Sequence, residues 1–479
     1  MHPSDHGIAL ELGIMLAASL LADRLVRPRG WRSLAGYGLQ ILLLLALAGA
    51  MLALSGSVIV TMLISVGLAT ALVLISNTKM AVLGEPLLFS DLVLVGAVFR
   101  HPQFYLLALK RWQLAALVLG GIGLLALMAW RFVPDPLPHL IGLAGLALAL
   151  LLLRICLALP PWRRLAPRPD ALADVAAHGL TATVLLHWQR WRSTADPAAP
   201  PAIAAGSTTA ELVVVVQCES FADPVELFAD QGLALPGLAA ARQAATLHGR
   251  LLVSGFGAYT MRTEYGVLFG RDEDALGFRR FDPYLTATRE AGHALPARLT
   301  PAGWHSLFLH PHDLRFYARD RILAAAGFAE LVGPEAFAPP AVGRYVSDAA
   351  IADMIMARAQ AARGPSLIHA VTIENHGPWP ADRAGAHGRQ SSAYLALVAR
   401  GDAMLARLMA GIAALRRPAV LLFYGDHRPS IPGAVTPGGD RHTPYVLLRF
   451  DADGAIVPGN QRDLTPAQLH HALLAAIMA

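Results

Sequence analysis

Charge is scarce in this chain. Of its 479 residues only 15% are charged, the mean hydropathy is +0.47 and the formal net charge is +5. So little charge with so positive a hydropathy is unusual for a protein that is entirely water-soluble, and the length exceeds that of one ordinary domain. We therefore expect a membrane part together with at least one further domain.

Cysteine is nearly absent as well. Cys156 lies inside the last long apolar run, and Cys218 ends an aliphatic strand candidate. These positions predict no disulfide between the two, and the cysteine content does not report the redox compartment.

A basic stripe interleaved with aromatic residues is also missing, which argues against a nucleic-acid site. The arginines instead gather beside the apolar runs, where they suit anionic lipid headgroups. They are Arg24, Arg27, Arg29, Arg32, Arg111, Arg163 and Arg164.

Long apolar runs fill the first third of the chain. Each is near the roughly 20 residues that a helix needs to cross a bilayer. They lie at about 8–22, 36–54, 57–76, 113–130 and 138–158, and no such run returns after residue 160. We predict an all-α membrane domain of about five transmembrane helices over residues 1–160. Because the runs contain almost no ionisable residues, a transporter is not expected.

A connecting segment is predicted over residues 161–208. Within it, residues 169–192 place Trp188 and Trp191 beside arginines, which suits a helix along the membrane surface, and a Pro/Ala linker follows at 197–207. Residues 77–112 carry a shorter apolar piece that we also expect at the interface.

The remaining residues, 209–479, are predicted to form an α/β catalytic domain. Short aliphatic runs alternate with helix-length segments, a pattern typical of a mainly parallel sheet covered by helices on both faces. The runs are 211–217, 304–310, 366–373, 418–424 and 444–449. In open α/β sheets the ligand site lies outside the carboxyl ends of the strands.

Polar side chains follow four of these runs, namely Glu219, His310, His376 and the pair Asp426 and His427. Each alone is explained as well by a cap, a turn or a loop. Their convergence on one sheet edge favours a site. Glu219, Asp426 and His427 form an oxygen and nitrogen ligand set that suits Zn²⁺ or Mn²⁺ and leaves a coordination position open.

The stretch AYTMRTEYGVLFG, residues 258–270, places Thr260 at the start of a helix-compatible segment, where an anion such as phosphate is favoured. Coordination to a divalent cation would activate its hydroxyl, so Thr260 is predicted to be nucleophile and metal ligand. Arg262 or Glu264 could hold the loop. For Thr263 and Glu264, capping of the helix explains the residues equally well.

With these residues in hand, the chain resembles the lipoteichoic acid synthase and phosphoglycerol transferase family, sulfatase-like enzymes of the alkaline phosphatase superfamily. The motifs VQCES, GAYTMRTE, FYARD, NHGPW and YGDH occur in the family order. The resemblance implies one catalytic metal ion, usually manganese but also zinc or magnesium, bound by Glu219, Thr260, Asp426 and His427.

The resemblance further implies that His310, Tyr317 and Arg319 hold the glycerol phosphate group, with His376 close to the transferred phosphate. Tyr317 replaces the tryptophan expected in lipoteichoic acid synthases, and the loop before Thr260 is one residue longer. For His442 three interpretations stay open: a further ligand, an acceptor-side residue, or a polar residue flanking a strand.

The predicted activity is transfer of glycerol phosphate from phosphatidylglycerol to a glycan or polymer acceptor. A phosphoethanolamine transferase is the first alternative, although those enzymes usually carry several disulfides in this domain. A sulfatase-like phosphodiester hydrolase is the second, although the formylglycine pattern C/S-x-P-x-R is missing near residue 260. A non-catalytic membrane sensor is the third, and the retained ligand set argues against it.

Two features predict opposite sides of the membrane for the catalytic domain. The arginines at 24–32 and around 100–111 would place the catalytic domain in the cytoplasm. The family layout places it outside, where a lipid headgroup and a glycan acceptor would meet. We adopt the family layout and predict a multi-pass protein of the cell (inner) membrane with an extracytoplasmic, periplasmic catalytic domain.

Overall fold

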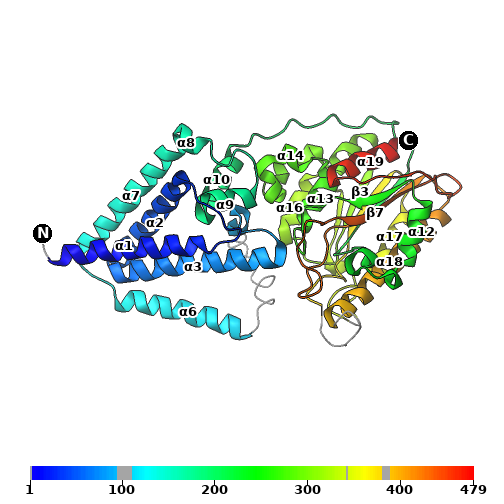
Figure 1. Ribbon diagram of the computed structural model, residues 1–479. Coiled ribbons are helices and arrows are strands. Elements are labelled where there is room, and N and C mark those ends of the chain that lie inside the picture. Colours follow the sequence, from blue (N-terminus) through cyan, green and yellow to red (C-terminus); the bar gives the residue numbers. More distant parts are fainter. Residues whose placement is uncertain (1–2, 94–110, 341–342, 380–388) are drawn as a thin grey trace. The chain divides into compact units, whose positions relative to one another are not determined.

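A computed structural model describes residues 3–93, 111–340, 343–379 and 389–479 (Figure 1). The chain divides into two compact units, Met1–Thr194 and Ala195–Ala479. The boundary between them falls inside the predicted connecting segment. The interfacial segment expected at 77–112 begins within a long helix, and its residues 94–110 lie outside the described part of the chain.

The first unit is helical. Its long helices are α1 (Pro3–Arg24), α2 (Leu34–Ser55), α3 (Val58–Leu83), α6 (Arg111–Trp130) and α7 (Pro136–Ala158), and its short ones are α8 (Pro160–Arg163), α9 (Ala171–His178) and α10 (Leu180–Ser193). Each predicted apolar run therefore falls in a helix. Among the described residues, however, only α2, α3 and α7 are long and apolar enough to cross a membrane.

The predicted number of five spans is therefore somewhat too high. Helix α1 includes Asp5, Glu11 and Asp23, and acidic residues are costly in hydrocarbon. For α6 the described apolar stretch is Val118–Trp130, and the helix itself runs from Arg111 to Trp130.

Helices α2 and α7 pack closely because glycines face each other. A Cβ atom on Gly49 would lie 2.5 Å from the Leu146 nitrogen, and one on Gly142 would lie 2.3 Å from the Ala53 nitrogen. Small residues that allow backbones to approach are typical of helix contacts in membranes.

The second unit contains an eight-stranded sheet in the order β4-β3-β5-β1-β6-β7-β2-β8. The strands are β1 (Leu212–Cys218), β2 (Leu247–Leu251), β3 (His305–Leu309), β4 (Glu330–Val332), β5 (Ser366–Val371), β6 (Ala419–Gly425), β7 (Thr443–Phe450) and β8 (Asn460–Gln461). The first five strands in this order are mutually parallel, whereas β7 is antiparallel to both β6 and β2. The prediction of a mainly parallel sheet is confirmed.

Helices cover both faces of this sheet (Figure 1). They are α11 (Pro224–Phe228), α12 (Pro236–Ala244), α13 (Thr260–Phe269), α14 (Glu273–Leu276), α15 (Leu295–Leu299), α16 (Arg319–Ala325), α17 (Asp348–Ala361), α18 (Arg389–Ala414) and α19 (Pro466–Met478). Alternate β1 residues, such as Val214 and Val216, pack into one core with α12, α17 and α18. Gln217 points to the other face and contacts α13, so the central strand is buried on both sides.

Candidate metal centre and nucleophile helix

Three predicted ligands meet at the carboxyl edge of the sheet. Glu219 directly follows β1, and Asp426 and His427 directly follow the neighbouring parallel strand β6. Each of the three offers a ligand atom within 4.8 Å of the others, and all three side chains are buried. Two adjacent strand ends therefore deliver two carboxylates and one imidazole to the same point.

Asp426 is held in a fixed orientation with one oxygen unused. Its Oδ1 accepts hydrogen bonds from the backbone nitrogens of Ser220 (2.8 Å) and His427 (3.0 Å). Its Oδ2 is buried without a hydrogen-bond partner and lies 3.4 Å from the His427 Nε2. Because an unpaired buried carboxylate oxygen is costly, this arrangement fits a divalent cation that would occupy the space between the three side chains.

The electrostatics of the cluster agree with this fit. Burial and the Glu219 carboxylate raise the pKa of Asp426 above its usual range. Burial lowers the pKa of His427, but the carboxylates of Asp426 and Glu219 outweigh it and raise the pKa overall. Like charges held together in a dry site favour a positive partner, either a proton or a metal ion.

Thr260 begins α13 and faces this cluster. Its Oγ1 lies 3.4 Å from the His427 Nε2, and the residue is 8% exposed. The preceding Tyr259 has a φ of 73°, a strained conformation for a residue with a side chain. In the same loop Gly257 has a φ of +64°, and a Cβ there would lie 2.4 Å from the Ser430 Cβ, so glycine is required.

Capping does not explain the polar residues of the TMRTE motif, since α13 has no side-chain cap. Thr263 donates a hydrogen bond from Oγ1 to the Asp426 carbonyl at 2.7 Å. Arg262 donates from Nε to the Phe281 carbonyl at 3.1 Å, and its guanidinium lies 3.9 Å from the Tyr259 ring centroid. The capping interpretation is therefore wrong, and each residue ties α13 to a neighbouring segment.

Glu264, one turn after Thr260, forms a buried ion pair with Arg319. The Arg319 Nη2 lies 2.6 Å from Oε2 and its Nε lies 3.0 Å from Oε1, and the side chains are at most 2% exposed. Gln217 and Tyr284 also donate hydrogen bonds to this carboxylate. Although burial raises the pKa of Glu264, the Arg319 guanidinium lowers it to about 2, so the carboxylate is charged.

His310 lies on the other side of Arg319. Its Nδ1 is 2.9 Å from the Val371 carbonyl, to which it donates, and its Nε2 is 3.4 Å from the Arg319 Nη1. Burial and the Arg319 charge lower the pKa of His310 to about 3, so the imidazole is neutral. The Nε2 of this neutral imidazole faces the Arg319 Nη1 and can accept a hydrogen bond from it. His310 therefore helps to orient the guanidinium and adds no second positive charge beside it.

Tyr317 and His376 were also predicted at the site. Tyr317 has a φ of 59° and is half-buried, and the Arg319 guanidinium lies 5.2 Å from its ring centroid. His376 is exposed on the loop after β5, where its ring lies 5.9 Å from Tyr345. Tyr317 therefore lies beside Arg319, whereas His376 lies on a separate loop at the same sheet edge.

The structure places His442 outside the three-residue cluster. Its two ring nitrogens contact the carboxylates of Glu226 and Asp440, and it is 6% exposed. Arg428 donates from Nε to the His442 carbonyl at 2.7 Å, while the Arg428 carbonyl lies 3.1 Å from the His427 Nδ1. His442 is thus linked to the cluster through Arg428.

Sequence reasoning missed the residues that hold Glu219. Ser220 donates from Oγ to the Glu219 Oε1 at 2.9 Å, and Thr372 accepts from the Glu219 backbone nitrogen at 3.0 Å. Tyr394 donates to the Ser220 carbonyl at 3.1 Å. Ser220 stands within the VQCES motif and could have been inferred from it, whereas Thr372 and Tyr394 are brought close only by the fold.

Backbone strain is concentrated around the same residues. Four of the seven described non-glycine residues with positive φ are Ser220, Tyr259, Tyr317 and Ala318. They follow Glu219, precede Thr260 or adjoin Arg319. Strain of this kind persists where the surroundings impose it, and it clusters at functional sites.

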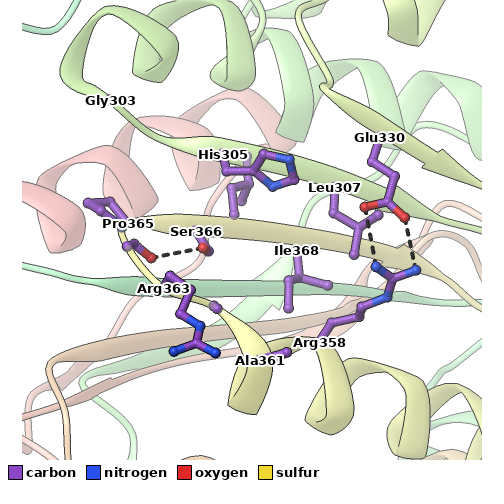
Figure 2. A pocket seen from close by; sticks show the side chains of 13 residues that line it. Gly303, His305, Leu307, Glu330, Arg358, Ala361, Arg363, Pro365, Ser366 and Ile368 are labelled. Carbon is purple, nitrogen blue, oxygen red and sulfur yellow. Dashed lines mark hydrogen bonds and ion pairs between the residues drawn. The ribbon is translucent and has the colours of Figure 1, made fainter.

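A cavity lies at the opposite edge of the sheet. It measures about 390 Å³ and lies against the amino ends of β3 and β5, beside His305 and Ser366. Figure 2 shows Glu330 and Arg358 paired there, with an oxygen to nitrogen distance of 2.9 Å. Ligands of open α/β sheets bind at the carboxyl edge, which makes this cavity the weaker candidate.

Comparison with known proteins identifies the class. The Sulfatase family model matches residues 211–476, more than half of the chain, and the chain belongs to this family. The expected sulfatase-like membership is confirmed. The match spans β1 to α19 and includes the complete carboxyl-edge cluster described above.

Two curated relatives come from Rhizobium meliloti (strain 1021). The capsular polysaccharide biosynthesis protein RkpI is 30% identical over 407 residues, covering 78% of this chain and 74% of the relative. A putative cyclic beta-1,2-glucan modification protein is 26% identical over 234 residues, covering 46% of this chain and 36% of the relative. The match to RkpI extends beyond the catalytic unit into the helical one.

Solved structures are more distant. The Streptococcus pyogenes phosphoglycerol transferase GacH, in complex with sn-glycerol-1-phosphate, is 16% identical with a TM-score of 0.45, covering 57% of this chain and 75% of that one. The lipoteichoic acid synthase LtaP from Listeria monocytogenes is 17% identical with a TM-score of 0.44, covering 60% and 77%. Family membership therefore rests on the sequence matches.

Proposed function

We propose that this protein is a membrane-bound phosphoglycerol transferase that moves glycerol phosphate from phosphatidylglycerol to a glycan or polymer acceptor. The observation that carries the proposal is the Thr260 hydroxyl beside two carboxylates and an imidazole, with the Asp426 Oδ2 buried and without a hydrogen-bond partner. The names of both curated relatives refer to glycans, which supports a glycan acceptor.

Glu219, Asp426 and His427, together with the Thr260 hydroxyl, would hold one divalent ion, which we take to be Mn²⁺, with Zn²⁺ or Mg²⁺ as alternatives. When bound, such an ion lowers the pKa of the threonine hydroxyl and withdraws charge from phosphoryl oxygens. The helix start at Thr260 adds backbone N–H groups that favour an anion.

The reaction is a double displacement. The Thr260 hydroxyl loses its proton to solvent and its Oγ attacks the phosphorus of phosphatidylglycerol, the bond from phosphorus to the diacylglycerol oxygen breaks, and glycerol phosphate remains esterified to Thr260. An acceptor hydroxyl then attacks the same phosphorus, the threonine ester breaks, and Thr260 regains its proton. His376 is the candidate to protonate the diacylglycerol oxygen and to take the proton of the acceptor.

Arg319, His310 and Tyr317 are proposed to hold the glycerol phosphate group. Glu264 engages the Nε and Nη2 of Arg319, and the His310 Nε2 lies 3.4 Å from Nη1, so the second hydrogen of Nη1 is the one proposed to contact a phosphoryl oxygen. The half-buried Tyr317 ring beside this guanidinium supplies an apolar wall for the glycerol carbons.

The direct test is mass spectrometry of the Thr260 peptide. The purified full chain is incubated with Mn²⁺ and vesicles of phosphatidylglycerol or of phosphatidylethanolamine, with Thr260→Ala as control. We expect a glycerophosphoryl adduct from the first lipid only, and none in the variant. An ethanolamine phosphate adduct would instead establish a phosphoethanolamine transferase. Release of glycerol phosphate without any adduct would establish a hydrolase.

We further propose that the protein crosses the cell (inner) membrane several times and that its catalytic unit lies on the periplasmic side. Three helices long enough to span support a membrane anchor. A phospholipid headgroup and an envelope glycan are both available on the outer side, which is the reason for this orientation.

Replacement of His442 by alanine is expected to weaken Mn²⁺ binding by about 10–100-fold, the usual effect of losing a group that orients a metal ligand. The physical reason is the chain of contacts from His442 through Arg428 to the His427 Nδ1. Isothermal titration with Mn²⁺ measures it. His305→Ala, at the exposed opposite edge, is the matched control, and equal affinity in both variants would refute this role.

A further inference from the structure

Helix α10 has an apolar stripe in addition to the one that packs into the helical unit. Ala182 and Leu186 are buried against neighbouring helices. Thr181, Val184, Leu185 and Trp188 lie on another face, at the i, i+3, i+4 and i+7 spacing of a helical stripe, and are only partly covered.

This second stripe forms one wall of a groove of about 450 Å³, which we call the α10 groove. Leu43 of α2 and Leu72 of α3 contribute further lining, as do residues between 87 and 93. Among the described lining residues, Thr181 is the one whose side chain is neither aliphatic nor aromatic. Because α2 and α3 are long and apolar enough to span a membrane, a hydrocarbon chain is the chemistry that such a groove fits.

One end of the groove carries the side chains that mark a headgroup region. Trp188 is 41% exposed, and the Arg192 guanidinium lies 4.7 Å from its ring. Tryptophan and arginine at adjacent turns are typical of the membrane–water interface, and arginine there attracts anionic lipids. The nearby acid Asp91 is paired with Lys79, so its charge is neutralised.

We infer that the α10 groove holds an acyl chain of an anionic glycerophospholipid whose headgroup lies at Arg192. The inference rests on the proposed function in one respect, namely that anionic glycerophospholipids are the class of lipid that this protein uses. The apolar lining fits an acyl chain of any phospholipid, and the positive charge of Arg192 selects an anionic headgroup over a zwitterionic one.

The test uses the full-length Thr260→Ala protein in lipid nanodiscs, so that no turnover is involved. The probe is phosphatidylglycerol with a photoreactive diazirine in one acyl chain, and the cross-linked peptides are mapped by mass spectrometry. We expect cross-links within residues 181–188 that excess unlabelled phosphatidylglycerol suppresses and excess phosphatidylcholine does not. Arg192→Ala is expected to reduce this preference about fivefold.

Filling the groove provides a matched pair of variants. Leu185→Trp, inside the groove, is expected to reduce the cross-link severalfold, whereas Leu148→Trp, on the exposed face of α7, is expected to leave it unchanged. If Leu185→Trp fails to fold, the competition between the two unlabelled lipids still decides the question. Equal labelling of α7 and α10, insensitive to either competitor, would show an annular lipid only and overturn the inference.

The cross-linking result and the Thr260 adduct test the lipid site and the proposed function separately. Competed cross-links in the groove together with no Thr260 adduct in the wild-type protein would keep the lipid site and reject phosphoglycerol transfer. A Thr260 adduct with non-specific cross-linking would keep the reaction and reject the groove as a specific lipid site.

Discussion

Asp426→Asn is expected to lower transfer activity by about 10³-fold or more, because loss of a metal-binding carboxylate removes several kcal/mol of transition-state stabilisation. The asparagine oxygen can still accept from the Ser220 and His427 nitrogens, which contact Oδ1 in the wild type. The amide nitrogen would then stand at the position of the unpaired Oδ2, where it cannot bind a cation. The fold is thus retained while the centre is lost.

Turnover with phosphatidylglycerol, Mn²⁺ binding and the unfolding temperature of the full chain together measure this effect. The matched control is Asp353→Asn, an exposed carboxylate on α17 paired with Arg407, for which no change is expected. An Asp426→Asn protein that keeps a tenth or more of the wild-type activity, even at limiting Mn²⁺, would remove Asp426 from the proposed centre.

Arg319→Met is expected to destabilise the catalytic unit by about 3–5 kcal/mol, the usual cost of leaving one partner of a buried ion pair uncompensated. Glu264 is fully buried, and Gln217 and Tyr284 cannot neutralise its charge. The double variant Arg319→Met/Glu264→Leu is expected to recover most of the stability because it removes both charges. Both proteins should lack transfer activity, since each lacks the guanidinium proposed to hold the phosphate.

Thermal unfolding and hydrogen exchange of α13 and α16 in the detergent-solubilised full chain measure the difference. The pH dependence of the stability difference between the wild type and Arg319→Met provides a further check. The lowered pKa of Glu264 stabilises the wild type above the unfolded value of 4.5, and this contribution is lost as pH falls from 4.5 toward about 2. The gap between wild type and Arg319→Met should therefore shrink on acidification, and a gap that is constant with pH would contradict a charge-based origin.

Hydropathy and strand pattern predicted the two-part organisation and the α/β class because both depend on local periodicity. Among the described residues fewer helices qualify as spans than predicted, in part because apolar run length alone does not weigh the acidic residues of α1. The structure brings Glu219, Asp426 and His427 together, because parallel strands place the residues that follow them at one edge of the sheet.

The sequence by itself determined which residues follow the buried strands and where Thr260 begins a helix, because these are matters of order along one chain. Only the tertiary structure decided that Glu264 pairs with Arg319, that Thr372 and Tyr394 brace the Glu219 segment, and that the Asp426 Oδ1 accepts from the Ser220 nitrogen. These contacts join segments far apart in sequence. They form because burial of each charged or polar group requires a partner that only packing can bring close.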